Sequence, residues 1–532
     1  MSITSRKNSV LALLALLYYC CIEISDTVTE KSSLHYQSIA RFSHLENDFL
    51  DNLIERKHPV VGDEKRKRNE TIAGPSQKFA QVKTAWLPQR INHFNPTDKR
   101  EFKQRYMYNR EFYKNSGLAF LLVGGESEIS EWKIGYPSLP ILLWAKKYGA
   151  ACFLLEHRFF GESQPFNNTS VESYKYLTID QALADLKTFI LKANKIFFWK
   201  FTKPRWVLFG ASYPGALAAW FRATNEDLTT AAIVSSGIVH PRVDNHDYLK
   251  NVQNVLEKMN PKCAEAIGLG MEEIISKTYT WDGRMVLATA FNTCEPFPEK
   301  LTPETLQYFF TIILYLFKGS VIYSGQNFIS VRDLCEIMLS NKEKSYMKRI
   351  QNAWNYQNVI SKWNRCNNID YKINLAYLND SSLDGKSNVE DRSFKWLSCT
   401  ELGLLQTTNY GKSIFGSTIP LDYYSAQCME LFGDQYDARR IRDGVHRTLR
   451  KYGGNSNYNG SRTVFVNGSN DPWKSLCCLK CNNAIREVYS VTVEGSSHCN
   501  DMQPIKPSDS QSLKNARVFV GMKLEMFIRK SF

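Results

Sequence analysis

Beyond its N-terminus, the 532-residue sequence has no apolar run close to the roughly 20 residues that a membrane-spanning helix needs. A later candidate, TIILYLF at residues 311–317, is too short and fits a buried helix. We therefore expect no transmembrane anchor. The N-terminus differs, because Arg6 and Lys7 precede an apolar stretch of about a dozen residues, a pattern typical of a cleaved signal peptide. We assign the signal peptide to residues 1–25 and expect entry into the secretory pathway.

The cysteines lack the pattern of a zinc site, in which two pairs of ligands follow each other at fixed spacing. Cys477, Cys478 and Cys481 form a close cluster without a second pair, so we expect no metal and no cofactor. Of the thirteen cysteines, Cys20 and Cys21 leave with the signal peptide and eleven remain. This content is typical of an oxidising compartment with several disulfides, and the odd number leaves at least one thiol unpaired.

Positive charge is in excess but is not concentrated in a binding face. Lys and Arg number 67 against 53 Asp and Glu, and the surplus is spread along the chain with one dense run, KRKR at 65–68. We interpret it as a basic solvated surface and expect no nucleic-acid partner. Residues 26–80 are polar and contain that run, so they form either a propeptide cut near Arg68 or a flexible arm. No internal repeat is present.

Six asparagines stand in N-glycosylation sequons, which carry glycans only if the chain is secreted. They are Asn69, Asn167, Asn168, Asn379, Asn459 and Asn467.

From residue 117, short apolar runs alternate with helical segments. The runs at 117–125, 150–158, 205–210 and 229–237 predict strands, and 139–149, 178–195 and 216–225 predict helices. Strands and helices that alternate in this way indicate an α/β fold, a mostly parallel sheet with helices on both faces. We assign residues 81–240 to the first part of this domain.

The alternation stops after His240. Residues 241–435 are rich in helical patterns and hold six cysteines, which predicts an inserted helical cap domain stapled by disulfides. Strand patterns return at 462–473 and 488–499, and a helix over 516–528 closes the chain. We assign residues 436–532 to the second part of the α/β domain, so the cap divides the sheet in sequence.

Three polar residues follow predicted strands of this divided sheet: Ser212, Asp471 and His498. Ligands gather at the carboxyl ends of strands in open α/β sheets, and the order Ser, Asp, His is the order of the α/β-hydrolase fold. A serine nucleophile needs an imidazole to take its proton and a carboxylate to hold the imidazole. The joint placement therefore predicts a catalytic triad, although each residue alone is equally typical of a turn or a helix cap.

The strict G-x-S-x-G pattern of a nucleophile elbow is absent, because Pro214 stands where the second glycine belongs. Proline is accepted in the first turn of a helix, where its missing N–H has no partner in any case. The Tyr213 N–H would then lie at the start of the helix as one oxyanion donor. The second donor is expected from Gly124-Gly125-Glu126, with Gly125 as the candidate; an ordinary tight turn is the alternative there.

Longer stretches carry a resemblance to one peptidase family. They are QRINHFNPTDKREFKQRY (89–106), LLVGGE (121–126), EHRFFGES (156–163), YLTIDQALADL (176–186), GASYPG (210–215), WLSCTELGLLQT (396–407), NGSNDPW (467–473) and SSHCNDM (496–502). The chain resembles the serine peptidases that include lysosomal prolyl carboxypeptidase, the lysosomal Xaa-Pro dipeptidyl peptidase and thymus-specific serine protease, and it looks closest to the last branch.

The resemblance implies an α/β-hydrolase domain with a helical cap over the active site, and it implies the same three catalytic residues. It also implies that Trp473 lines the pocket for a substrate proline ring. The implied disulfide pairs are Cys399–Cys428, Cys263–Cys335 and Cys294–Cys366. Three positions depart from the family's usual pattern, Asn92, Ala211 and Ser127; Ser127 lies near the proposed oxyanion loop and puts that donor in question.

We therefore expect a secreted or lysosomal serine exopeptidase that cleaves beside proline near a peptide terminus. Carboxypeptidase and dipeptidyl aminopeptidase activities stay open, since the first needs a cation for the substrate carboxylate and the second an anion for its amino group. Glu126 is the candidate for that anion. A catalytically silent binding protein is one alternative. An esterase is another, disfavoured by the lack of an HGGG motif. A homodimer is left open.

Overall fold

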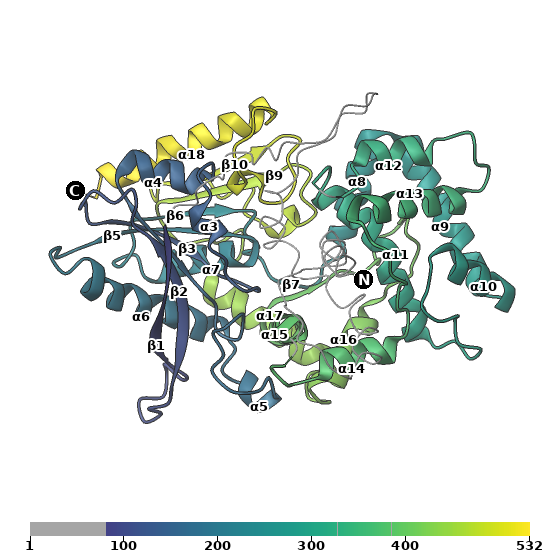
Figure 1. Cartoon of the computed structure of the whole chain (residues 1–532), viewed down its shortest axis with the longest axis horizontal. Coiled ribbons are helices and arrows are strands. Elements are labelled where there is room, and N and C mark those ends of the chain that lie inside the picture. Colours follow the sequence, from purple (N-terminus) through teal and green to yellow (C-terminus); the bar gives the residue numbers. More distant parts are fainter. Residues whose placement is uncertain (1–80, 327, 385, 532) are drawn as a thin grey trace, which may run out of the picture.

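The structure is a computed structural model, and it describes residues 81–326, 328–384 and 386–531 (Figure 1). The expected signal peptide, the polar leader and Asn69 lie outside the described residues. The described chain forms a large sheet with helices on both faces, and a group of helices lies beside one edge of these layers.

The large sheet has eight strands in the order β1-β2-β4-β3-β5-β6-β9-β10. Its strands are β1 (Val82–Arg90), β2 (Glu101–Asn109), β3 (Leu118–Val123), β4 (Ala151–Leu155), β5 (Arg205–Ala211), β6 (Ala231–Ser235), β9 (Thr463–Gly468) and β10 (Val488–Val493). β2 runs antiparallel to both of its neighbours, and every other pair of neighbours runs parallel. This is the arrangement of the α/β-hydrolase fold that the sequence predicts.

The central strands are apolar throughout because both of their faces are buried. Leu208 of β5 enters the core beneath α6 (Ile179–Phe197) and α7 (Ser212–Thr224). Its neighbours Val207 and Phe209 enter the core under α4 (Pro140–Tyr148) and α18 (Gln511–Arg529), which cover the opposite face (Figure 1). A short helix, α3 (Trp132–Gly135), adds to this second core.

The edge strand β1 and its neighbour β2 are the part of the sheet that the alternation of apolar runs did not predict. They pair along their whole length, from Val82 opposite Asn109 to Arg90 opposite Glu101. Their sequences are polar because only part of each strand is buried, as in EFKQRYMYN of β2, where buried and more exposed residues largely alternate.

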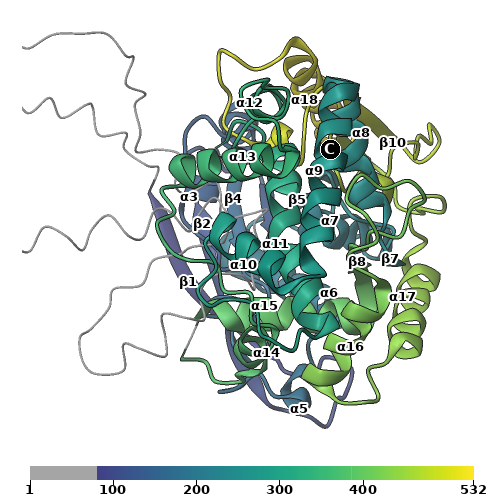
Figure 2. The same ribbon diagram turned by 90° about the vertical axis from the view of Figure 1, so that its right-hand side faces the viewer.

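The helical cap lies between β6 and β9 in sequence (Figures 1 and 2). Its helices are α8 (Asp247–Met259), α9 (Pro261–Thr278), α10 (Trp281–Ala290), α11 (Pro303–Ile322), α12 (Val331–Met338), α13 (Tyr346–Ser361), α14 (Tyr371–Asn379), α15 (Lys386–Leu397) and α16 (Leu421–Phe432). A small parallel pair, β7 (Arg242–Asp244) and β8 (Gly403–Leu405), precedes α17 (Ala438–Tyr452) and the return to the large sheet. There β6 and β9 pair directly, with Ser235 opposite Val466, so the insertion leaves the sheet continuous.

Disulfides join the cap at three places, and they are the three pairs that the resemblance implies: Cys263–Cys335, Cys294–Cys366 and Cys399–Cys428. The apolar segment around 311–317 belongs to α11, which is 20 residues long and therefore longer than expected. Within the described residues α11 alone is long and apolar enough to cross a membrane. It is a core helix of the cap, because 89% of its apolar window is buried.

Candidate active site at the carboxyl edge of the sheet

Ser212 lies on the bend between β5 and α7, where the sequence places a nucleophile elbow. Its φ of +57° is in the left-handed region, which a non-glycine residue adopts at an energetic cost that active sites commonly bear. The bend is too tight for larger neighbours. A Cβ at Gly210 would lie 2.2 Å from the Pro214 carbonyl oxygen, and a Cβ at Gly215 would lie 3.0 Å from the Gly237 Cα. The glycines therefore allow the strained turn that holds Ser212.

Pro214 lies in the first turn of α7, as predicted, and its ring contacts the loop after β3. A Cβ on Gly125 would lie 2.2 Å from the Pro214 Cγ, so the loop and the helix fit closely only with glycine at 125. Gly124 is not available as a donor, because its N–H donates to the Leu155 carbonyl at 2.9 Å. Tyr213 follows Ser212 at the start of α7, where N–H groups have no partner within the helix. Gly125 and Tyr213 thus stand on two adjoining segments beside Ser212.

His498 and Asp471 meet in the buried interior of this edge. The Nδ1 atom of His498 lies 2.7 Å from Oδ2 of Asp471, and both side chains are almost fully buried. A carboxylate only accepts, so Nδ1 carries the proton and Nε2 of the neutral ring is the basic nitrogen. The other carboxylate oxygen of Asp471 accepts a hydrogen bond from the backbone N–H of Trp473 at 2.9 Å. The aspartate is therefore held by its own loop while it orients the histidine.

Hydrogen bonds tie the loops of Ser212 and His498 to each other through the loop after β6. The Ile238 N–H donates to the Ser212 carbonyl at 3.4 Å, and the Cys499 N–H donates to the Ser236 Oγ at 3.1 Å. Ser236 and Cys499 also have positive φ, at +44° and +52°. The three predicted residues thus stand at the carboxyl ends of β5, β9 and β10. Hydrogen bonds between the loops hold Ser212, Ser236 and Cys499 in their strained backbone conformations.

Arg517 of α18 holds the loop that carries His498 through hydrogen bonds, a role that local sequence patterns did not suggest. Its guanidinium donates to the carbonyls of Asn500, Asp501 and Gln503 at 2.9–3.0 Å, and it pairs with Asp509. The pKa of the Asp501 carboxyl is raised to about 6, mainly by burial.

A cavity of about 110 Å³ lies in the cap beside these loops. It is lined by Tyr308, Thr311, Lys318, Asn374, Leu378, Asp391, Phe394, Lys395, Ser398, Gly403, Leu404, Leu405, Gln406, Tyr423, Tyr424, Gln427 and Trp473. Trp473 thus belongs to the lining, whereas Ser212, Asp471 and His498 do not. Glu126, the candidate anchor for an amino group, is 1% exposed and is not part of this lining.

Lys318, Lys395 and Asp391 are the charged residues of the cavity lining. The pKa of Lys318 is lowered to about 7 by burial and then by the charge of Lys395. Burial likewise lowers the pKa of Lys395 to about 8, while Asp391 acts in the opposite direction. The sequence prediction missed these lysines, although Lys318 is the one charged residue in the apolar stretch TIILYLFKGSVI, which was a usable signal.

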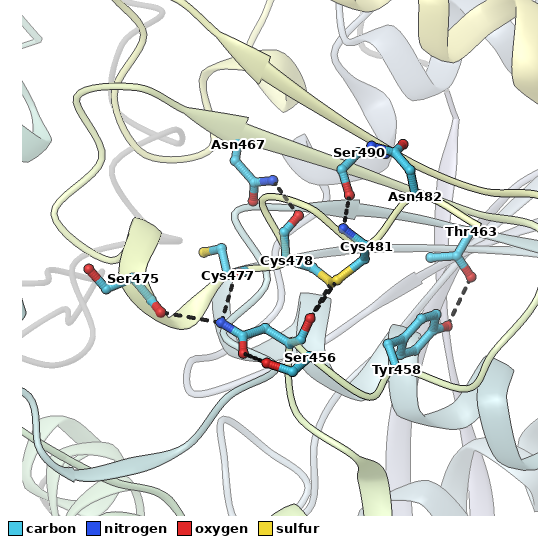
Figure 3. Close-up of a disulfide and its surroundings, with 11 residues drawn as sticks. Ser456, Tyr458, Thr463, Asn467, Ser475, Cys477, Cys478, Cys481, Asn482 and Ser490 are labelled. Carbon is cyan, nitrogen blue, oxygen red and sulfur yellow. Dashed lines mark hydrogen bonds between the residues drawn. A yellow bond between two sulfur atoms is a disulfide. The ribbon is translucent and has the colours of Figure 1, made fainter. Parts of the chain in front are cut away.

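The cysteine cluster belongs to the loop that carries Asp471. Cys478 and Cys481 form a disulfide, which leaves Cys477 as the one thiol of the three (Figure 3). Cys152, Cys477 and Cys499 are buried and form no disulfide within the described residues.

The expectation of a surface glycan is wrong for one sequon, at the start of the same loop. Asn467 is 1% exposed, and its side-chain amide donates to the Cys478 carbonyl at 3.0 Å. A glycan on Asn467 is therefore excluded in the folded chain.

The other described sequons lie at the surface. Asn167, Asn379 and Asn459 are exposed and Asn168 is partly exposed, so each is open to modification if the chain is secreted.

Comparisons with known proteins identify the family of this chain. The serine carboxypeptidase S28 family matches residues 89–520. A putative serine protease of Caenorhabditis elegans is 35% identical over 454 residues, which cover 83% of this chain and 83% of that protein. The thymus-specific serine protease of Homo sapiens is 28% identical, with 84% of this chain and 87% of that protein covered. The lysosomal Pro-X carboxypeptidase of Mus musculus is 26% identical, with 83% and 88% covered. The matched region contains Ser212, Asp471 and His498, and the chain therefore belongs to the serine carboxypeptidase S28 family.

Proposed function

We propose that this serine-type peptidase is an exopeptidase that cleaves beside proline near a peptide terminus, through an acyl-enzyme on Ser212. The observation that carries the proposal is the buried Nδ1–Oδ2 hydrogen bond of His498 and Asp471 beside the strained Ser212. His498 Nε2 would take the Ser212 proton while Oγ attacks the carbonyl, and would then give that proton to the leaving amine. Water activated by the same nitrogen would hydrolyse the ester.

The Tyr213 and Gly125 N–H groups are the proposed oxyanion donors. Both belong to rigid segments beside the nucleophile, and donors of this kind stabilise the developing charge without reorganisation.

Trp473 is proposed to contact the substrate proline ring. Its indole lines the cavity, and its backbone is anchored to Asp471, so a ring bound there would lie close to the triad. The name of the Pro-X carboxypeptidase relative supports a proline-containing substrate. The four disulfides within the described residues support a secretory-pathway location, and that relative's name supports the lysosome as one destination besides secretion.

The test uses Ala-Pro-Phe with both termini free, from which either a carboxypeptidase or a dipeptidyl aminopeptidase would release phenylalanine, and the Ser212→Ala variant. The wild-type protein should release phenylalanine, and Ser212→Ala should lower kcat by at least about 10⁴-fold. Ser276→Ala, an exposed serine on α9, is the matched control and should leave kcat unchanged. Full turnover by purified Ser212→Ala would overturn the proposal.

A further inference from the structure

We infer that the exposed face of α17 (Ala438–Tyr452) is a binding surface for a linear sulfated polysaccharide. The positive charge that the sequence spreads along the chain is concentrated at this helix in the fold. α17 carries five arginines and one lysine against one aspartate, so it supplies five of the fourteen net positive charges of the chain. The inference uses the secretory-pathway location proposed above and is independent of the peptidase activity.

The orientation of α17 is fixed by its apolar face, which packs against the protein. Ile441 and Val445 of this face are buried. A Cβ on Gly444 would lie 1.8 Å from the Thr400 carbonyl oxygen, so the helix approaches the neighbouring backbone closely at this glycine. Figure 2 shows α17 at the right-hand edge of the described chain. The packing therefore holds the opposite face of the helix toward solvent.

That opposite face is almost entirely cationic. Its exposed charged or titratable residues are Arg439, Arg440, Arg442, Asp443, His446, Arg447, Arg450 and Lys451. On a helix with 3.6 residues per turn, positions 439, 442, 446 and 450 form one row that rises by about 16 Å, and positions 440, 447 and 451 form a second row beside it. Cations repeated along two rows suit a chain with repeated anionic groups better than a single small anion.

Most cations of this face lack a carboxylate partner within the described residues. Lys451 alone among them forms an ion pair in that part of the chain, with Asp180 at 2.6 Å. The Asp437 carboxylate, directly before the helix, accepts the Arg440 backbone N–H at 2.8 Å and so caps the helix. Guanidinium groups stay charged at physiological pH and offer paired N–H donors that fit the oxygens of phosphate-like groups such as sulfate. The arginines are therefore available to an external anion.

Helix stability does not account for this cluster. The N-terminal end of a helix carries partial positive charge, so Arg439, Arg440 and Arg442 are unfavourable near the start of α17. Like charges four residues apart, such as Arg447 and Lys451, also repel each other. Cations favour the helix only in its last turn. A group of side chains that lowers local stability in this way is typical of a functional site.

The surroundings of the cluster favour a polysaccharide over a membrane or a nucleic acid. A helix that docks on a bilayer inserts an apolar face between the lipids. The apolar face of α17 is buried, and its exposed residues include no large apolar side chain. Sulfated polysaccharides are made in the secretory pathway, a location that the disulfides within the described residues support, whereas nucleic acids are absent there.

The experiment measures the affinity of the full chain for heparin, a densely sulfated polysaccharide. The double variant Arg439→Gln/Arg442→Gln should bind at least about 10-fold more weakly than the wild type, because two charge-assisted contacts are lost. The wild-type affinity should fall by at least about 100-fold between about 50 and 200 mM salt, since binding to a dense polyanion releases its counterions. Arg332→Gln/Lys348→Gln removes two exposed cations on α12 and α13, and this matched control should leave binding nearly unchanged.

Thermal unfolding separates a loss of binding from a loss of folding. Arg439→Gln/Arg442→Gln should unfold at the same or a slightly higher temperature than the wild type, because it removes cations from the start of the helix. A second double variant at the other end of the face, Arg447→Gln/Arg450→Gln, should show the same loss of heparin affinity. Both variants should cleave peptides at the wild-type rate, so failure of this inference and failure of the proposed function are distinguishable.

Unchanged heparin affinity in either folded double variant would overturn the inference. The affinities for a DNA duplex and for phosphatidylcholine vesicles that contain phosphatidylserine are measured in the same way. The wild-type chain should bind heparin more tightly than both. Equal or tighter binding of the duplex or the vesicles, lost in the α17 variants, would also overturn the inference, because the partner would then be a nucleic acid or a membrane.

Discussion

The imidazole Nδ1 of His498 and the carboxylate Oδ2 of Asp471 lie 2.7 Å apart, and both side chains are buried. The pair holds the ring in one tautomer, with Nε2 as the basic nitrogen. Asp471→Asn would offer an amide donor and favour the opposite tautomer, so we expect kcat to fall by about 10⁴-fold with little change in folding. Steady-state kinetics and circular dichroism test this. Asp434→Asn, an exposed aspartate, is the control. A fall below tenfold would show that Asp471 does not orient the base.

The contact between Gly125 and Pro214 gives a prediction about the oxyanion loop. Gly125→Ala places a methyl group 2.2 Å from the Pro214 Cγ, so the loop must shift, and we expect kcat to fall by about 100-fold through loss of one donor. In a Pro214→Ala background the Cγ and Cδ atoms are absent, so Gly125→Ala should lower kcat by a clearly smaller factor. Purely additive effects in this double-mutant cycle would rule out the contact as the cause.

Lys318→Met should stabilise the protein, and more so at low pH. The folded pKa lies below the unfolded value, so the penalty for a buried ammonium is fully present below about pH 7 and disappears as the pH rises toward the unfolded pKa. Thermal unfolding midpoints at pH 5 and pH 9 test this. An increase in midpoint that is larger at pH 9 would contradict it.

The disulfides should differ in their effect on stability because they close loops of different length. Replacing Cys263 and Cys335 together by serine opens a loop of 72 residues and should lower the free energy of unfolding by about 4 kcal/mol. The same change at Cys478 and Cys481, which are 3 residues apart, should lower it by less than about 2 kcal/mol. Thermal unfolding of both double variants checks the order. A larger loss for the short loop would show that this disulfide has a packing role.

The three candidate catalytic residues could be located from sequence because each one follows a strand that is recognisable on its own. Ser212 comes after an apolar run, and the neighbouring Gly210 and Gly215 indicate a tight turn even without the strict motif. Strands β1 and β2 could not be predicted in the same way, since they are only partly buried and their polar residues hide the strand pattern.

The cavity was beyond a local sequence pattern for a different reason. Lys318 and Lys395 belong to separate helices and face the same space only because α11 and α15 pack in the cap. Asn467 shows the converse, since a valid sequon is buried by the loop of the Cys478–Cys481 disulfide. Local motifs predict chemistry, whereas tertiary packing decides access.

The most direct test of the account is to map the site of a fluorophosphonate probe on the folded protein by mass spectrometry. The account predicts a single adduct on Ser212, no adduct in Ser212→Ala, and a much slower reaction in His498→Ala, because the probe reacts with a serine that a base has activated. An adduct on another serine, or labelling that persists in Ser212→Ala, would contradict it.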